Sequence, residues 1–299
     1  MLRLIFLLLP FFAFAMDPIR VMYVNYNLKE KDFKTAVESV KKSMEGQGLQ
    51  VMRTLTISDA IRARGNKDFR NYYVIFGCKF EGMDSLLLKA PALTNIAPCS
   101  VAVYEDKGKV RATVINHGVF LSKYKDRLTP SERKAVDEVY RKLHSALAKA
   151  STNKPRLPKA PPIKDDLVYE EIIEGLDFDT FKTLYKTSLD GANMNILDVM
   201  DIRQESPKLS IFLACNLTYG EAILKDIPQF GTLAPCRVYM YEKEGKVVTG
   251  YINIPFLLKT YGKHLSKENA EIFKKGRPGY KACLKGSKGG VIYNSSQAL

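Results

Sequence analysis

The chain has 299 residues, of which 46% are apolar and 26% are charged, so neither a wholly disordered chain nor a collagen-like chain is expected. Lysine and arginine (46) outnumber aspartate and glutamate (32), and the resulting formal net charge of +14 favours anionic partners or surfaces. With three histidines in the whole chain, a histidine-rich metal centre is not expected.

Residues 1–15 have the pattern of a secretory signal peptide. Arg3 precedes an apolar run, and Ala13-Phe14-Ala15 supplies the small-x-small pattern that signal peptidase needs. The apolar run is well short of the roughly 20 residues that span a bilayer, which argues against the alternative of an uncleaved anchor. The sequence therefore predicts cleavage near Ala15 and a periplasmic or secreted protein without a transmembrane segment, in a compartment where disulfides persist.

The residues after the signal alternate between strand and helix patterns. Gly77 ends a continuous apolar run that is typical of a buried strand. The last helix should begin at Thr129, with Pro130 in its first turn and Glu132 completing a capping box. The expected elements are a strand at 21–27, a helix at 31–45, strands at 49–57 and 72–77, a short helix at 84–88, strands at 101–104 and 110–115, and a helix from 130.

The chain contains the same unit twice. Shifted by 137 positions, residues 74–129 align without a gap on residues 211–266, with 17 identities in 56 positions where chance gives about three or four. Upstream of this block the offset is 148, so the first copy carries extra residues, which we expect as a polar surface insertion around Ser58–Arg70.

The repeat sets the predicted domain boundaries. We expect a first repeat domain at 17–150, a proline- and lysine-rich linker at 151–164, a second repeat domain at 165–276 and a glycine- and lysine-rich tail at 277–299. Each copy should be an α+β domain of order β-α-β-β-β-β-α. Residues 165–205 carry 11 acidic and 3 basic residues, so the basic first copy is expected to dock partly against this acidic segment.

The repeated motif resembles the domain of unknown function 302 family. The resemblance lies in an apolar strand that ends in a cysteine, a short helix, and then a Pro-Cys pair followed by a strand and a glycine hairpin. The matching residues are Phe76-Gly77-Cys78 with Ala97-Pro98-Cys99, and Leu213-Ala214-Cys215-Asn216 with Ala234-Pro235-Cys236. Members typically have Asn-Pro after the first cysteine; Asn216 keeps the asparagine, whereas Lys79 does not, and neither copy has the proline. The resemblance implies an antiparallel sheet with two helices on one face, and it implies no reaction.

Two cysteine pairs with the same separation are the sharpest chemical feature. Cys78 and Cys99 in the first copy correspond to Cys215 and Cys236 in the second, each pair joining the end of one strand to the start of another. If those strands are antiparallel neighbours, the Cα atoms could lie within the roughly 4.4–6.8 Å that a disulfide needs. Three interpretations stay open: a structural disulfide in each domain, a redox-active or ligand-binding dithiol, and buried cysteines too far apart to bond.

The remaining site candidates are few. Asn116 and Asn253 are repeated, and they are either turn residues or ligand contacts. Cys283 has no counterpart, and either pairs between chains or has no role. A metal site is not expected, because the histidines near the cysteine pairs are not repeated: His117 corresponds to Ile254, and His264 to Arg127.

The sequence predicts a binding protein more readily than an enzyme. It contains no glycine-rich dinucleotide or phosphate loop, no nucleophile elbow, no zinc-protease motif and no Cys-x-x-Cys, so no catalytic residue and no cofactor is assigned. The signal peptide argues against nucleic acid as the partner. We therefore expect an exported interaction protein whose ligand is unknown, with an acidic protein or an anionic envelope component as partner. The alternative is a thiol-redox protein, or a carrier of a thiophilic ligand or metal, that uses the four repeated cysteines.

Overall fold

The computed structural model describes residues 17–159, 165–191, 194–233, 236–275 and 293–294. The predicted signal peptide and most of the tail, including Cys283, lie outside these residues. The first copy contains α1 (Pro18–Met22), β1 (Tyr23–Asn27), α2 (Phe33–Glu45), β2 (Val51–Leu55), α3 (Ile57–Ala63), β3 (Tyr72–Gly77), α4 (Met83–Lys89), η1 (Pro91–Asn95), β4 (Cys99–Asp106), β5 (Lys109–Ile115), α5 (His117–Tyr124), η2 (Lys125–Arg127) and α6 (Pro130–Ala150).

From its first strand the second copy repeats this order, except that its described residues include no counterpart of α3. Its elements are β6 (Val168–Ile173), α7 (Phe178–Gly191), β7 (Asn195–Arg203), β8 (Leu209–Cys215), α8 (Leu217–Asp226), η3 (Pro228–Thr232), β9 (Cys236–Lys243), β10 (Lys246–Ile252), α9 (Ile254–Tyr261), η4 (Gly262–His264), α10 (Lys267–Lys275) and the short β11 (Tyr293–Asn294).

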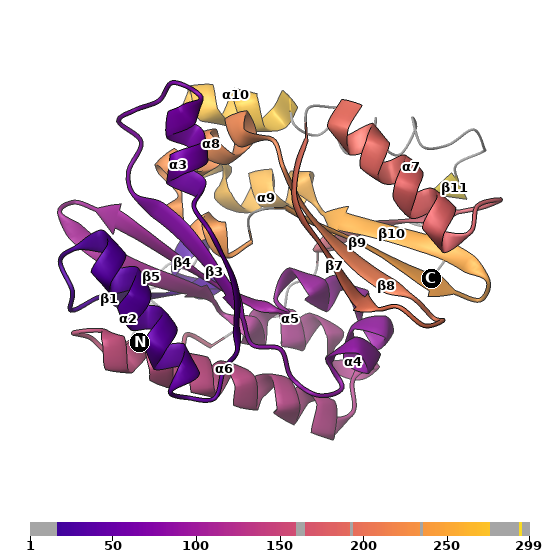
Figure 1. Cartoon of the computed structure of the whole chain (residues 1–299), viewed down its shortest axis with the longest axis horizontal. Helices are drawn as coiled ribbons and strands as arrows, with labels where there is room; N and C mark the ends of the chain where they lie inside the picture. Colours follow the sequence, from indigo (N-terminus) through magenta and orange to yellow (C-terminus); the bar gives the residue numbers. More distant parts are fainter. Residues whose placement is uncertain (1–16, 160–164, 192–193, 234–235, 276–292, 295–299) are drawn as a thin grey trace, which may run out of the picture.

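Each copy forms one antiparallel sheet with the same strand order. The first sheet is β1-β5-β4-β3-β2, and the second is β6-β10-β9-β8-β7 with β11 added beside β6. Hairpins join β4 to β5 and β9 to β10, and all the pairings are antiparallel. The predicted α+β fold in two tandem copies is confirmed, and Figure 1 shows the two sheets next to each other.

Local sequence explains where the long helices begin. The side chain of Asp32 accepts a hydrogen bond from the Thr35 amide and caps α2. Thr129 and Glu132 form the predicted capping box at the start of α6. Helix α2 buries Val37, Val40 and the other apolar residues of one face, packs against α6, and with it covers one face of the first sheet.

The second copy keeps one of these two helices in place. Helix α7 covers the outer face of the second sheet, where Phe181 and Tyr185 pack with Phe212 and Met240 in a separate small core. The last helix, α10, instead packs against α8 and α9. In the described range it has nine residues against the 21 of α6, so it presents less apolar surface than its counterpart.

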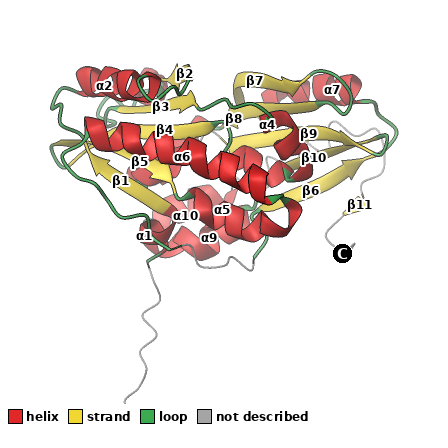
Figure 2. Cartoon of the chain, turned by 90° about the horizontal axis from the view of Figure 1, so that it is seen from below, coloured by secondary structure: helices red, strands yellow, loops and turns green. Residues whose placement is uncertain are grey.

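The two copies share one hydrophobic core. The main cluster of buried side chains runs from the first copy through Leu209, Ile211 and Tyr239 on the inner face of the second sheet. Figure 2 shows the sheets meeting side by side, and α9 of the second copy packs against α1 of the first. The copies are therefore packed together, and are not two independent domains held by a linker.

The start of the linker lies against the first sheet. The Thr152 amide donates to the Asn27 carbonyl (2.8 Å), and the Asn27 amide donates to the side chain of Asn153 (2.7 Å). Further along, the side chain of Asn116 donates to the Pro158 carbonyl (3.0 Å). The described part of the linker is extended, as predicted, but it is fixed to the free edge of β1.

The segment predicted as a surface insertion at Ser58–Arg70 is largely exposed, but it also contributes to the contact between the copies. It forms α3, in which Ser58 and Ile61 are buried. Beyond the helix, the Asn66 side chain donates to Glu221 (2.6 Å), and Arg70 donates to the Lys225 carbonyl (2.8 Å). A polar segment lies at this interface because its hydrogen bonds are satisfied by α8 of the other copy.

The acidic segment at 165–205 also contacts the first copy. Arg53 on β2 pairs with Asp198 on β7 (2.7 Å), and Lys123 pairs with Asp166 (3.5 Å). These pairs are partly exposed and contribute little stability each. The contact predicted from charge is thus present, but the core of the interface is apolar and hydrogen-bonded.

Candidate functional site at the cysteine pairs

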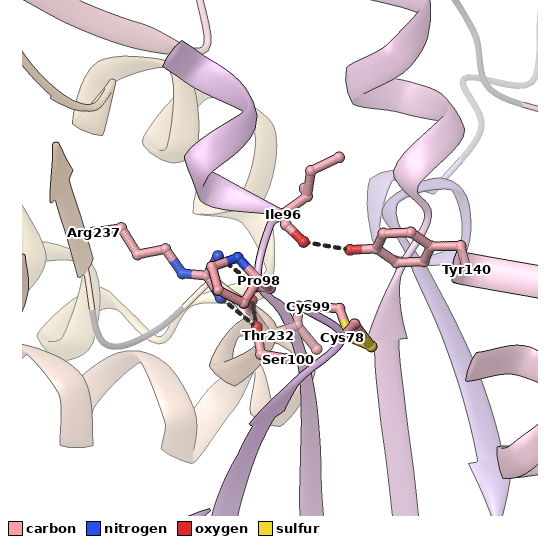
Figure 3. Close-up of a disulfide and its surroundings, with 8 residues drawn as sticks. All are labelled: Cys78, Ile96, Pro98, Cys99, Ser100, Tyr140, Thr232 and Arg237. Carbon is pink, nitrogen blue, oxygen red and sulfur yellow. Dashed lines mark hydrogen bonds between the residues drawn. A yellow bond between two sulfur atoms is a disulfide. The ribbon is translucent and has the colours of Figure 1, made fainter. Parts of the chain in front are cut away.

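Cys78 and Cys99 lie at one edge of the first sheet. Cys78 directly follows β3, Cys99 begins β4, and Gly77 is paired opposite Cys99. The Cα atoms are 5.5 Å apart and the two sulfur atoms are joined as a disulfide (Figure 3). For this pair, the interpretation of two cysteines too far apart to bond is wrong.

The chain before the disulfide is tightly packed. A Cβ atom on Gly77 would lie 2.7 Å from the Gln50 carbonyl oxygen, so a larger residue would displace the backbone just before β2. Cys78 itself has a φ of 66°, in the left-handed region that a non-glycine residue occupies at some cost. Cys78 and Cys99 are 1% and 2% exposed, so solvent does not reach the sulfur atoms in this conformation.

The second pair has the equivalent place on the backbone. Cys215 ends β8 and Cys236 begins β9, with Ala214 paired opposite Cys236, as Gly77 is opposite Cys99. The side chains of Cys215 and Cys236 lie outside the described residues. The repeat therefore extends to backbone position, and the bonding state of this pair stays a prediction.

The repeated asparagines hold the first strand of each copy. Asn116 donates to the Val21 carbonyl (2.9 Å), and Asn253 donates to the Asp166 carbonyl (2.8 Å). Asn253 also caps α9 by accepting from the Phe256 amide (3.1 Å). Both asparagines are buried, at 3% and 9% exposed, and these internal bonds explain their repetition without a ligand.

A buried aromatic and histidine cluster lies beside the cysteine site. The Tyr140 hydroxyl donates to the Ile96 carbonyl (2.8 Å), in the segment that leads to Cys99 (Figure 3). The His117 ring stacks on Tyr140, with centroids 4.2 Å apart, and its Nε2 lies 3.0 Å from Asp137. Burial lowers the pKa of His117, although the carboxylate of Asp137 opposes this shift. His117 is thus part of the core of the first copy.

His144 extends this cluster toward the first strand. Its Nδ1 lies 2.7 Å from the Tyr26 hydroxyl. Burial and, secondarily, the charge of His117 lower the pKa of His144 to about 4. The histidine is therefore neutral at pH 7.

A buried arginine next to the disulfide was not recognised from the sequence. Arg237, 1% exposed, extends from β9 into the first copy and donates to the carbonyls of Thr94 (2.6 Å) and Pro98 (2.9 Å). It also donates to the Ser100 hydroxyl (2.8 Å; Figure 3). Its guanidinium lies over the Phe76 ring, 5.2 Å from the ring centroid.

No carboxylate pairs with Arg237 among the residues that the structure describes. Burial lowers the pKa of its guanidinium to about 10, with Tyr140 acting in the opposite direction. The repeat contained one signal of this role: arginine follows the second cysteine of copy two where copy one has serine.

Nothing in the described part of the chain resembles a metal centre or a membrane anchor. It contains no group of three or more histidine, cysteine, aspartate or glutamate side chains suited to hold a metal ion. No helix within the described ranges is long and apolar enough to cross a bilayer. Three open clefts of about 360 to 490 Å³ are lined mainly by polar residues of the first copy, with Lys225 from the second, and no cysteine lines any of the three.

Comparison with known proteins supports the repeat. The family model described as "Domain of unknown function DUF302" matches residues 24–150 and 171–276. An uncharacterized protein of Aquifex aeolicus is 46% identical over 135 residues, which are 45% of this chain and 93% of that protein. A crystal structure of an uncharacterized conserved DUF302 protein from Bacillus stearothermophilus is 12% identical, with a TM-score of 0.37 over 43% of this chain and 97% of the other.

Proposed function

Because this chain belongs to the DUF302 family, whose description assigns no function, we propose its function from its own geometry. We propose an exported, non-enzymatic interaction protein in which the paired cysteines form structural disulfides. The observation that carries the proposal is the burial of Cys78 and Cys99, at 1% and 2% exposed. A dithiol that exchanges with partners must be reached by another thiolate, whereas a buried disulfide is inert.

The alternative is a thiol-redox protein, or a carrier of a thiophilic ligand or metal, that uses Cys78/Cys99 and Cys215/Cys236. One observation favours it: Cys78 has a left-handed backbone, and residues in such conformations cluster at functional sites. The burial of Cys78 and Cys99 is the stronger argument, because a thiol-exchange reaction at these sulfur atoms would require the first copy to open.

Equilibration with glutathione separates the two functions. The full-length oxidised protein is held in glutathione buffers of graded potential, quenched with an alkylating agent, and digested for mass spectrometry. We expect the peptides of Cys78 and Cys99 to stay linked, with a potential below about −300 mV. The Cys215 and Cys236 peptides should behave in the same way. A potential near that of glutathione, at roughly −200 mV, would favour the redox function instead.

The part of the molecule that suits an anionic partner is the basic strap, which we define as residues 154–159. Hydrogen bonds to Asn153 and Pro158 fix its two sides. Lys154, Arg156 and Lys159 are exposed between and beside these points, and within the described residues they make no ion pair. A fixed, extended row of free cations can meet an acidic protein or an anionic envelope component without losing much conformational freedom.

Removing the charge of the strap should weaken anion binding. We expect the Lys154→Gln, Arg156→Gln, Lys159→Gln triple variant to bind phosphatidylglycerol vesicles at least about tenfold more weakly than the parent, since each cation near an anionic surface is worth about 1 kcal/mol. Vesicle flotation at several salt concentrations measures this. A polyglutamate peptide, tested in parallel, distinguishes an acidic protein from a lipid surface.

A matched control removes the same charge elsewhere. Lys186, Lys243 and Lys267 lie on α7, β9 and α10 of the second copy and are exposed, and their triple glutamine variant should lose much less affinity. Equal losses in the two triple variants would show that net charge alone governs binding, and would remove the strap as the binding surface.

A further inference from the structure

The two copies hold each other through equivalent segments. In copy one, η1 lies against β9 and β10 of copy two; in copy two, η3 lies against β4 and β5 of copy one. These segments begin at Pro91 and Pro228, which the repeat aligns, and each leads to the second cysteine of its copy. The interface therefore has the arrangement of a two-fold dimer whose subunits are fused in one chain.

The contacts across this interface are not equivalent. From copy one, the Tyr72 hydroxyl donates to the Pro228 carbonyl, and the Ser100 hydroxyl donates to the Thr232 carbonyl (2.8 Å). From copy two, the buried side chain of Arg237 donates to two carbonyls of the segment that leads to Cys99. Each copy thus carries side chains suited to the other.

Tyr72 requires a glycine in its partner. A Cβ atom on Gly231 would lie 1.8 Å from the Tyr72 hydroxyl oxygen. In copy one, the position equivalent to Gly231 is Thr94, and in copy two the position equivalent to Tyr72 is Leu209. If two copies of the first unit were paired in this way, Tyr72 would collide with Thr94.

Arg237 requires a small polar residue in its partner. Arg237 contacts Ser100, and the repeat aligns these two positions with each other. Equivalent positions of the two copies therefore meet at the centre of the interface. If two copies of the second unit were paired in this way, two guanidinium groups would meet in a buried site where the described residues offer no carboxylate. Burying two like charges together is strongly unfavourable.

We propose that this interface is a pairing surface specific for the opposite copy, with Tyr72–Gly231 and Ser100–Arg237 as its determinants. The partner that fits copy one is copy two of the same chain, and like-with-like pairing is excluded by collision on one side and by charge on the other. Such exclusion is how related surfaces gain specificity. The assignment is independent of the proposed function.

A substitution cycle tests the first determinant. In the full-length chain, Gly231→Ala should lower Tm by roughly 5 °C or more, because the added methyl group overpacks the core against Tyr72. In the Tyr72→Leu background the same Gly231→Ala change should lower Tm by much less. Gly262→Ala is the control, since nothing lies within 4 Å of its added Cβ atom. An equal loss in both backgrounds, or no loss in either, would overturn the assignment.

Cleavage of the linker tests whether the two copies bind each other once they are no longer covalently joined. With a protease site placed within residues 160–164, the cleaved parent should elute from size exclusion as one complex of both halves. The halves should separate when the chain carries Ser100→Arg, whereas Ser100→Thr, which keeps the hydroxyl, should leave them together. If Ser100→Arg halves stay together with an unchanged Tm, charge at this position does not govern pairing.

Discussion

Replacing Arg237 by alanine should lower the free energy of unfolding by about 3 kcal/mol or more. The substitution leaves a cavity beside Phe76 and removes the donors that satisfy the carbonyls of Thr94 and Pro98. Each buried acceptor left without a donor costs about 1–3 kcal/mol. Urea unfolding of the full-length protein, followed by circular dichroism, measures the loss.

The buried charge of Arg237 partly offsets this loss, which makes a second variant informative. Burial disfavours the guanidinium, as its lowered pKa of about 10 indicates, so removing the charge itself is favourable. Arg237→Met fills the volume without the charge, and we expect it to lose less stability than Arg237→Ala. Arg141→Ala, at an exposed site on α6, should change stability by about 0.5 kcal/mol or less. An Arg237→Ala variant with an unchanged free energy of unfolding would contradict the stabilising role assigned to the hydrogen bonds of Arg237.

Acidification from pH 6.5 to pH 4 should destabilise the first copy through His144. Its pKa is about 4 in the folded protein and near 6.5 when the chain is unfolded, so between these values the unfolded state binds more protons. The contribution is fully present above pH 6.5, and is lost as the pH falls toward 4. It amounts to roughly 3 kcal/mol, and the lowered pKa of His117 acts in the same direction.

A neutral substitute isolates this effect from the carboxylates that titrate over the same range. His144→Gln removes the imidazole, and its unfolding free energy should fall less steeply than that of the parent between pH 6.5 and 4.5. Parallel pH profiles for the parent and His144→Gln would show that His144 is not buried as a neutral group.

Much of the fold is local, and was predictable from the sequence. The strand patterns, the capping box at Thr129 and Glu132, and the cysteine spacing each depend on nearby residues, and all correspond to the observed elements. The disulfide-bonded state of Cys78 and Cys99 was one of three open interpretations, because spacing alone does not fix the distance between strand ends.

The packing of the copies was not predictable in the same way. From the sequence, Arg237 is expected to be an exposed strand residue, but the other copy covers it. The insertion that contains Asn66 and Arg70 is polar because its hydrogen-bond partners lie on α8. The contact between the copies joins residues 137 to 155 positions apart in the chain. Hydrophobic periodicity describes only neighbouring residues, so it cannot predict such contacts. The helix α5, which follows Asn116, was also missed, since its short apolar run lies directly after a strand.

The linker residues beside β1 also bear on aggregation. Asn27 exchanges hydrogen bonds with Thr152 and Asn153, so the outermost strand of the first sheet does not offer its backbone groups to another molecule. The family match of this copy ends at residue 150, just before these contacts. A fragment that ends at residue 150 would leave the backbone groups of Asn27 without these partners and should self-associate through β1. A fragment extended by a few residues would keep these hydrogen bonds. The sequence that joins the duplicated units thus also protects the first of them.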